Sequence, residues 1–234
     1  KGAVNTKAKT STSAAPVGHA IEIVLKPYQN TKIYIGTNYG RNRVLADSAL
    51  LNEKSEGVFK SKTKLTPGIY FIVSPKYSIL FDFLVDEAQH FKIIADTLSL
   101  NAFQIIGSKE NDIFKAYSKS INDLGMQLSS IENKYKTATN AKDSASFKEL
   151  YLAKDKEVKA ARTNVINTNP GSMTSFFLNV MQRPEAPAMP TINGKLDSLY
   201  PYYYVKNHFW DDVVFNDDRL LRTPFFEEKL DEYF

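Results

Sequence analysis

Hydrophobic and polar residues alternate with a period of two over the first half of the chain. In the segment HAIEIVL, Ile21, Ile23 and Leu25 fall on one side and Glu22 on the other, and TKIYIG repeats the pattern. Such alternation is typical of a half-buried β-strand. The same reasoning predicts further strands at residues 43–49, 57–61, 68–74, 78–86, 89–96 and 102–106.

Turn signals separate these strands every ~8–12 residues, a spacing typical of sandwiches and barrels. Pro67-Gly68 marks one turn, and a short acidic turn predicts a hairpin between residues 78–86 and 89–96. The segment GTNYGRN lacks the residues of a phosphate-binding loop and is interpreted as a loop between two strands. No helical stripe interrupts the strands, so residues 18–107 are expected to form an antiparallel β-sandwich or barrel.

At Gly107-Ser108 the hydrophobic period changes to that of an α-helix. Ser108 is placed to cap a long helix. Apolar residues then recur every three or four positions, at Ile113, Tyr117, Ile121, Leu124, Leu128, Ile131 and Tyr135.

A second stripe, from Phe147 to Val165, follows the polar loop ATNAKD, with Ser146 and Glu149 as a possible capping box or a start two residues earlier. The two stripes predict an antiparallel helical hairpin, and a coiled-coil dimer seam is the alternative. Leucine is scarce at their core positions, which favours the hairpin within one chain over a homodimer, the alternative.

Three further helices are expected in an all-α domain over residues 108–234. The segment NPGS at 169–172 breaks the chain and caps a short apolar helix, and the stiff segment PEAPAMP follows it. Residues 196–209 are expected to be helical. Thr223-Pro224 places an N-cap before a proline at the first helical position, so a last helix is expected to run to Phe234. It has no C-cap, so the helical domain is expected to be truncated there. Residues 1–17 are expected to be a flexible leader.

Composition narrows the candidate chemistry. The chain has no cysteine, so thiol catalysis, disulfides and cysteine-ligated metals are excluded within it. Its 30 basic and 26 acidic side chains give a net charge of +4 and are interleaved, so no nucleic-acid partner is expected. No apolar run reaches the ~18–20 residues that a membrane-spanning helix requires.

No pattern of a catalytic, cofactor or metal site is present. The three histidines, His19, His90 and His208, are far apart in sequence, and no nucleophile elbow occurs. The acidic block from Asp211 to Asp218 offers oxygen ligands for calcium but lacks the alternating calcium-loop spacing. The preferred interpretation is that one of its last two carboxylates caps a turn and pairs with a nearby arginine.

The strongest candidate surface is the aromatic C-terminal segment. Tyr202, Tyr203 and Tyr204 are consecutive, so a helix cannot bury all three on one side. We interpret this segment as a possible interface rather than a ligand platform. Its members are Tyr202, Tyr203, Trp210, Phe215, Arg219, Arg222, Phe225 and Phe226.

Two groups of motifs carry a resemblance. The tail has His208-x-Trp210-Asp211, followed by Phe215-x-Asp217-x-Arg219-Leu220-Leu221-Arg222-Thr223-Pro224. The β-rich part has Asn30-Thr31, Tyr34-Ile35-Gly36, Asp47-Ser48-Ala49, Pro67-Gly68-Ile69-Tyr70-Phe71 and Gly107-Ser108 with Glu110-Asn111. These segments resemble two domains of unknown function that precede a thioredoxin-like domain in Gram-negative bacterial proteins, and the resemblance covers almost everything from Gly18 to Phe234.

The resemblance implies the N-terminal, non-catalytic region of a periplasmic or outer-membrane-anchored thiol-disulfide oxidoreductase. Its chemistry would belong to a Cys-x-x-Cys pair in the later domain, and this chain has no cysteine to match it. The implied partner is that thioredoxin-like domain, with a client unknown and a possible membrane tether outside this chain. The alternative is a cell-envelope module that binds a glycan or peptide between its two domains. A hydrolase with a site not visible in sequence is the third hypothesis.

Overall fold

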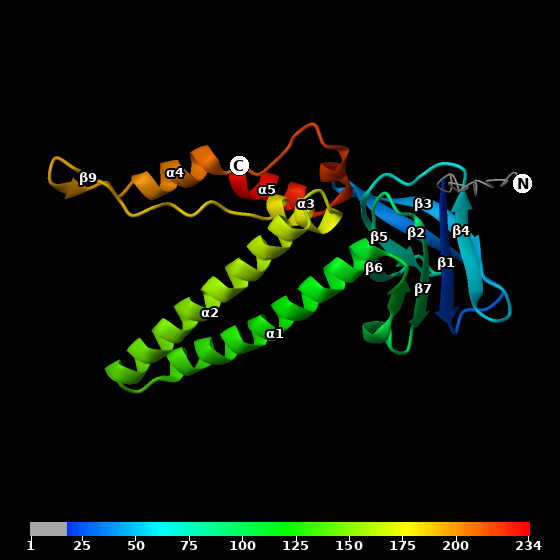
Figure 1. Ribbon diagram of the computed structural model, residues 1–234, viewed down its shortest axis with the longest axis horizontal. Helices are drawn as coiled ribbons and strands as arrows, with labels where there is room; N and C mark the ends of the chain where they lie inside the picture. The colour runs from blue at the N-terminus through cyan, green and yellow to red at the C-terminus, as the bar shows by residue number, and fades with distance from the viewer. Residues whose placement is uncertain (1–17) are drawn as a thin grey trace, which may run out of the picture.

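The computed structural model describes residues 18–234, and the predicted leader at 1–17 lies outside them. Strands fill the first half and five α-helices follow, so the protein is α+β (Figure 1). The change from strands to helices falls between Ile106 and Lys109. We refer below to the β region, residues 18–107, and the helical region, residues 108–234.

The β region contains two four-stranded sheets. The first has the order β4 (Glu56–Ser61), β1 (His19–Lys26), β7 (His90–Asp96) and β8 (Gln104–Ile106). The second has the order β3 (Asn42–Leu50), β2 (Lys32–Tyr39), β5 (Gly68–Val73) and β6 (Ile79–Val85).

The two sheets share one apolar core. Ile23 on β1, Ile35 on β2 and Ile72 on β5 are fully or almost fully buried in it, as the alternation of the sequence predicts. Both sheets keep open edges, so a closed barrel, one of the two expected forms, is wrong. Edge strands β3 and β6 pair on one side only.

The predicted hairpin between residues 78–86 and 89–96 is also wrong, because β6 and β7 belong to different sheets. The chain crosses between the sheets at Gln89. Its buried side chain accepts from the Leu65 N–H at 2.7 Å and donates to the carbonyls of Leu65 and Asp86 at 2.7 and 2.9 Å. After the crossing, β7 pairs in parallel with β1, so the expectation of purely antiparallel sheets fails at this pair.

The segment GTNYGRN forms more strand than predicted. β2 continues to Tyr39 and β3 begins at Asn42, so only Gly40 and Arg41 make the turn. Gly40 has a φ of +57°, a conformation that a two-residue hairpin turn requires and that glycine adopts without strain.

The predicted helical hairpin is confirmed. α1 (Lys109–Thr137) and α2 (Ala141–Thr168) lie antiparallel along each other (Figure 1). Ser108 caps α1 as predicted, accepting from the Asn111 N–H at 3.3 Å. The predicted start of α2 near Ser146 is wrong, because Asn140 accepts from the Asp143 N–H at 2.9 Å and begins the helix earlier.

The remaining elements match the predictions in part. α3 (Met173–Val180) is capped by Ser172 as predicted, and α5 (Phe225–Tyr233) begins after Pro224. Thr223 does not cap α5; its hydroxyl is buried and faces the Leu220 carbonyl at 3.5 Å. The helix expected over residues 196–209 is shorter. There a small hairpin of β9 (Thr191–Ile192) and β10 (Lys195–Leu196) precedes α4 (Tyr200–His208), so the helical region is not all-α. A short 3-10 helix, η2 (Asp218–Arg222), precedes α5.

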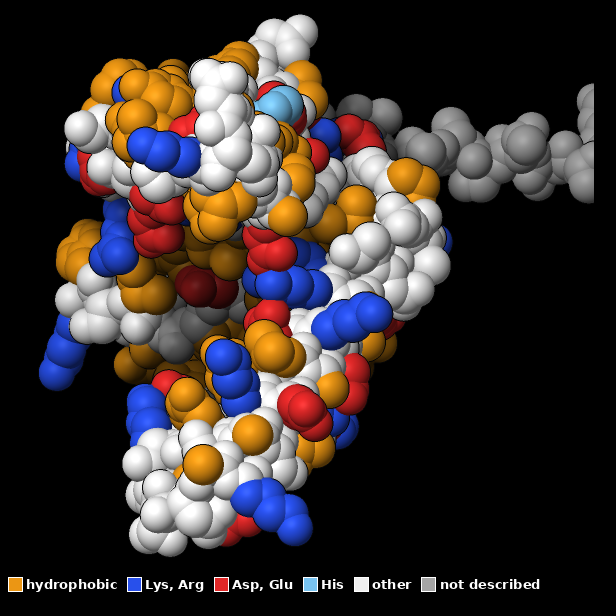
Figure 2. Space-filling model, turned by 90° about the vertical axis from the view of Figure 1, so that its left-hand side faces the viewer, with side chains coloured by type: hydrophobic (Ala, Val, Ile, Leu, Met, Phe, Trp, Pro, Cys, Tyr) orange, Lys and Arg blue, Asp and Glu red, His pale blue; other side chains and the backbone are white. Residues whose placement is uncertain are grey.

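Two projections extend from the β region. One is the hairpin of α1 and α2, and the other is the arm formed by β9, β10 and α4 (Figure 1). At their base, α3 and α5 form a second apolar core that also contains Leu84 of β6. Viewed end-on, the molecule is hollowed between the projections, and apolar side chains lie at the bottom of the hollow (Figure 2).

Candidate functional site

The β region is joined to α1 by a buried polar side chain. Asn111 accepts from the Leu84 N–H at 2.9 Å and donates to the Leu84 carbonyl at 2.8 Å. Leu84 lies on the edge strand β6, so the Asn111 amide replaces the neighbour strand that β6 lacks there. The Asn111 amide also donates to the Ser108 hydroxyl at 2.8 Å, which fixes the start of α1.

Glu110 joins the same end of α1 to α3. One carboxylate oxygen accepts from the Met173 N–H at 3.1 Å, and the other accepts from the Thr174 N–H and hydroxyl at 2.8 and 2.6 Å. These amides belong to the first turn of α3, where a helix carries partial positive charge. The buried carboxylate is therefore compensated by the helix terminus.

A third contact ties η2 and α5 to the turn between β2 and β3. The Gly40 N–H donates to the Leu221 carbonyl at 2.8 Å, and Arg41 pairs with Glu227 and Asp231 of α5 at 3.1 and 2.5 Å. Arg222 lies over the Tyr39 ring and against Gly68, where a Cβ would approach the Arg222 Cβ to 2.7 Å. We call these contacts and those of Glu110 and Asn111 the joint.

The predicted interface residues Trp210, Phe215 and Phe226 form one cluster. Ring centroids of Trp210 lie 5.5 Å from Phe215 and 6.4 Å from Phe226. Phe209 and Tyr233, which sequence reasoning missed, extend the cluster at 5.1 and 5.3 Å from Trp210. We call this set, together with Phe234, the aromatic block.

The other predicted interface residues lie elsewhere. Phe225 turns inward and packs on Phe177, with centroids 5.6 Å apart, and Arg222 belongs to the joint. Arg219 lies over Phe176 and pairs with Asp217 at 2.7 Å, as the turn-and-pair interpretation of the acidic block predicts. Burial acts to raise the pKa of the Asp217 carboxyl, but hydrogen bonds from the same arginine and its charge together outweigh this effect and lower the pKa.

Tyr202 and Tyr203 lie on the arm. They contact each other with centroids 5.2 Å apart and are 59 and 54% exposed, in agreement with the prediction that consecutive tyrosines cannot all be buried. They do not join the aromatic block. No residue of α4 is buried.

Lys229 is the buried charge that sequence reasoning missed. Its ammonium lies 4.8 Å from the Phe209 centroid and 5.7 Å from that of Trp210, and it donates to the Gln182 carbonyl at 2.7 Å. Burial, with a smaller effect of Arg183, lowers the pKa of Lys229 to about 8. The sequence does indicate this burial, because Lys229 is four residues from both Phe225 and Tyr233 and therefore lies on the apolar side of α5.

A cavity of about 290 Å³ lies between the outer face of the β3-β2-β5-β6 sheet and the helical region. We call it the junction cavity. Phe71 and Leu84 come from the sheet, and Phe114, Phe177 and Phe225 come from the helices. Asn38, Arg43 and Asp82 contribute its polar groups.

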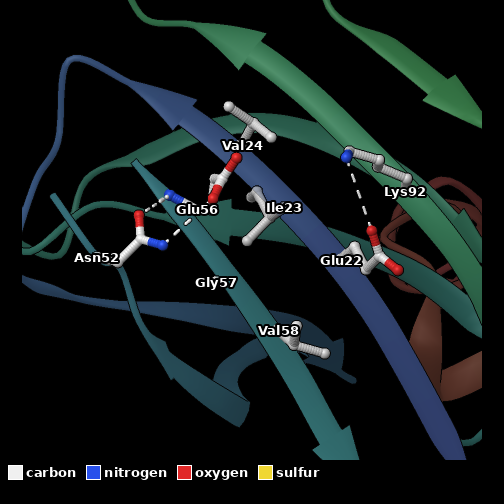
Figure 3. Close-up of a pocket in the computed structure, with 8 residues that line it drawn as sticks. All are labelled: Glu22, Ile23, Val24, Asn52, Glu56, Gly57, Val58 and Lys92. Atoms are coloured by element: carbon white, nitrogen blue, oxygen red, sulfur yellow. Dashed lines mark hydrogen bonds and ion pairs between the residues drawn. The ribbon is translucent and has the colours of Figure 1, made fainter. Parts of the chain in front are cut away.

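Another depression, on the outer face of the other sheet, is an ordinary solvated surface. Its polar side chains pair with each other, Lys92 with Glu22 at 3.7 Å and Asn52 with Glu56 at 3.2 Å (Figure 3). The two pairs lie apart and do not point toward a shared centre (Figure 3). We therefore assign no function to it.

Two of the three histidines contact a carboxylate. His19 is buried, and its two ring nitrogens face the Thr63 carbonyl and the Asp47 carboxylate, each at 2.8 Å. His208 contacts Asp211 at 2.7 Å on the surface. Within residues 18–234, no cluster of acidic and histidine side chains is arranged to hold a metal ion. No helix in this range is long and apolar enough to cross a membrane.

Comparison with known proteins leaves the chain without a demonstrated family. No family model matches it, and neither the curated proteins nor the solved structures contain a significant match. The family that the sequence motifs resemble is therefore a proposal for this chain.

Proposed function

We propose that this chain is a non-catalytic module of an exported thiol-disulfide oxidoreductase of the thioredoxin-like class, and that it positions the redox domain. The aromatic block carries the proposal. Phe215 and Phe234 are 62 and 96% exposed at its surface, while Trp210 lies partly buried behind them. Exposed aromatic groups around a tryptophan are typical of protein interfaces.

The joint supports a positioning role. A module that orients a second domain must itself be rigid. Asn111 of α1 and the contacts of η2 and α5 hold the helical region against the β region, and Glu110 fixes α3 to α1. The contacts of Leu84 and Gly40 involve backbone groups whose partners would be lost if the regions moved apart, so relative motion is costly. Phe226 and Tyr233 of the aromatic block lie on α5, and Trp210 packs on both, so the joint holds the block in place through α5.

Redox chemistry in this proposal belongs to the partner domain. Thiol-disulfide exchange requires a thiolate, and this chain contains no cysteine. We place the protein in the periplasm, or anchored at the outer membrane, of a Gram-negative bacterium, on the basis of the sequence resemblance. Purified residues 1–234 are expected to show no insulin-reductase activity, and any activity above the reagent blank would contradict the assignment.

The proposal is tested by the gene and by one matched pair of variants. The reading frame is expected to continue past Phe234 and to encode a Cys-x-x-Cys within about 150 residues, one domain length. With that domain produced separately, Phe215→Ala should weaken its binding to this chain about tenfold or more. Val58→Ala removes an apolar side chain that is 46% exposed on β4, outside the aromatic block, and should leave binding unchanged. A stop codon after Phe234, or equal binding by the two variants, overturns the proposal.

A further inference from the structure

We propose that the junction cavity binds a dipeptide-sized zwitterion with one large apolar side chain. This inference is independent of the proposed function, since it involves neither the aromatic block nor a redox domain. It rests on the wall chemistry of the cavity, on two charged side chains that have no partner among the described residues, and on the width of the sheet between their strands.

The walls of the cavity are aromatic and already in place. Phe71 and Phe177 are 5 and 4% exposed, and Phe114 and Phe177 meet edge to face with centroids 5.7 Å apart. The Phe71 ring fits because the facing residue on β2 is Gly36, where a Cβ would lie 2.2 Å from the ring. A preformed apolar pocket with a few polar groups at its rim is the usual form of a small-ligand site.

Opposite charges lie on the two sides of this pocket. Arg43 is on β3 and Asp82 is on β6, the two edge strands of the sheet. Among the described residues, neither side chain makes a hydrogen bond or an ion pair. Both residues are exposed at the rim of the cavity. Partial burial of the carboxyl group raises the pKa of Asp82, and the charge of Arg43 partly opposes this effect. A bound ammonium group would supply the pairing that Asp82 lacks.

The width of the sheet between the two charged residues limits the size of the ligand. Three strand spacings separate β3 from β6, which is about 14 Å at the backbone. Both side chains line the cavity, and they form no ion pair with each other. Two extended residues span about 7 Å. A dipeptide covers about half of this width and the side chains of Arg43 and Asp82 extend over the rest. Its carboxylate can then bind Arg43 and its ammonium Asp82, with an apolar side chain among the phenylalanines.

The probe is the dipeptide alanyl-phenylalanine, titrated by calorimetry against the full chain. Its N-acetyl form lacks the ammonium, and its C-terminal amide lacks the carboxylate. Each blocked form should bind about tenfold or more weakly, because a charge-assisted contact is lost. Asp82→Asn should abolish the preference for the free over the N-acetylated peptide and keep the preference for the free carboxylate. Arg43→Gln should do the reverse.

This pattern of lost preferences separates a bound zwitterion from general damage to the fold. Glu22→Gln, in the solvated depression of the other sheet (Figure 3), is the matched control and should leave all three affinities unchanged. The proposal is overturned if alanyl-phenylalanine shows no saturable binding. It is also overturned if the blocked forms bind as well as the free dipeptide, or if neutral oligosaccharides bind and the dipeptide does not.

Discussion

Replacing Asn111 by alanine tests whether the joint makes the β and helical regions one cooperative unit. The Asn111 side chain is only 5% exposed, and its amide satisfies both the N–H and the carbonyl of Leu84. Alanine leaves these two buried backbone groups without partners. Each such group costs about 1–3 kcal/mol, and partial access of water to the opened joint brings the expected loss to about 2–4 kcal/mol.

Two probes report on the two regions separately. Trp210 is the only tryptophan, so its fluorescence in a urea titration follows the helical region. Amide hydrogen exchange in β1 and β2 follows the β region at the same urea concentrations. In the wild-type protein the two transitions should coincide, and in Asn111→Ala they should separate, with the helical region unfolding first.

The matched control is Asn133→Ala, an exposed asparagine on the same helix. Because alanine has the higher helix propensity and no buried partner is lost, its unfolding free energy should change by about 0.5 kcal/mol or less. Equal unfolding free energies for the two variants, with coincident transitions in both, would refute the reasoning about the joint.

Three other substitutions test single contacts. Gly36→Ala should lower the unfolding free energy by about 1–3 kcal/mol in the same urea titration, because its Cβ would displace the Phe71 ring. Glu110→Gln keeps the shape of a buried side chain but removes its charge from the start of α3, and a loss of about 1–2 kcal/mol is expected. Burial lowers the pKa of Lys229 to about 8, so the unfolded chain binds more protons between about 8 and the ordinary value of 10.5. Wild-type stability should therefore rise with pH over this window, relative to Lys229→Met, by about 1–3 kcal/mol; parallel pH profiles would refute this.

Local patterns predicted most of the secondary structure but not the pairing of strands. Alternation located the strands of both sheets, and period changes located α1 and α2. The failure at residues 86–89 has a physical reason: a short acidic turn suits a hairpin and a crossing between sheets equally well. The buried amide of Gln89 favours the crossing over the hairpin, and its partner Leu65 lies far away in sequence. The parallel pairing of β7 with β1 is equally long-range.

The candidate site was predicted less well than the fold. Consecutive aromatic residues showed that some must be exposed, but not which ones meet. Trp210 and Phe215 come together, whereas Phe225 faces inward and Tyr202 lies on the arm. The junction cavity could not have been found from sequence, because its walls come from four strands and three helices brought together only by folding.

The motifs behind the resemblance contain residues of two kinds: residues of the joint, and the exposed residue Phe215. Asn111, Leu221 and Arg222 contact the β region, and Glu110 fixes α3 to α1. A match at these positions therefore predicts how the elements of the joint are fixed together. It carries no information on the chemistry of any further domain.

Phe215 differs from the residues of the joint, because it is exposed and stabilises no contact between the two regions. The fold alone does not account for an aromatic side chain there, since burial is the usual reason for one. A partner surface does account for it. The functional proposal therefore depends on the aromatic block, and Phe215→Ala tests it more directly than any substitution in the joint.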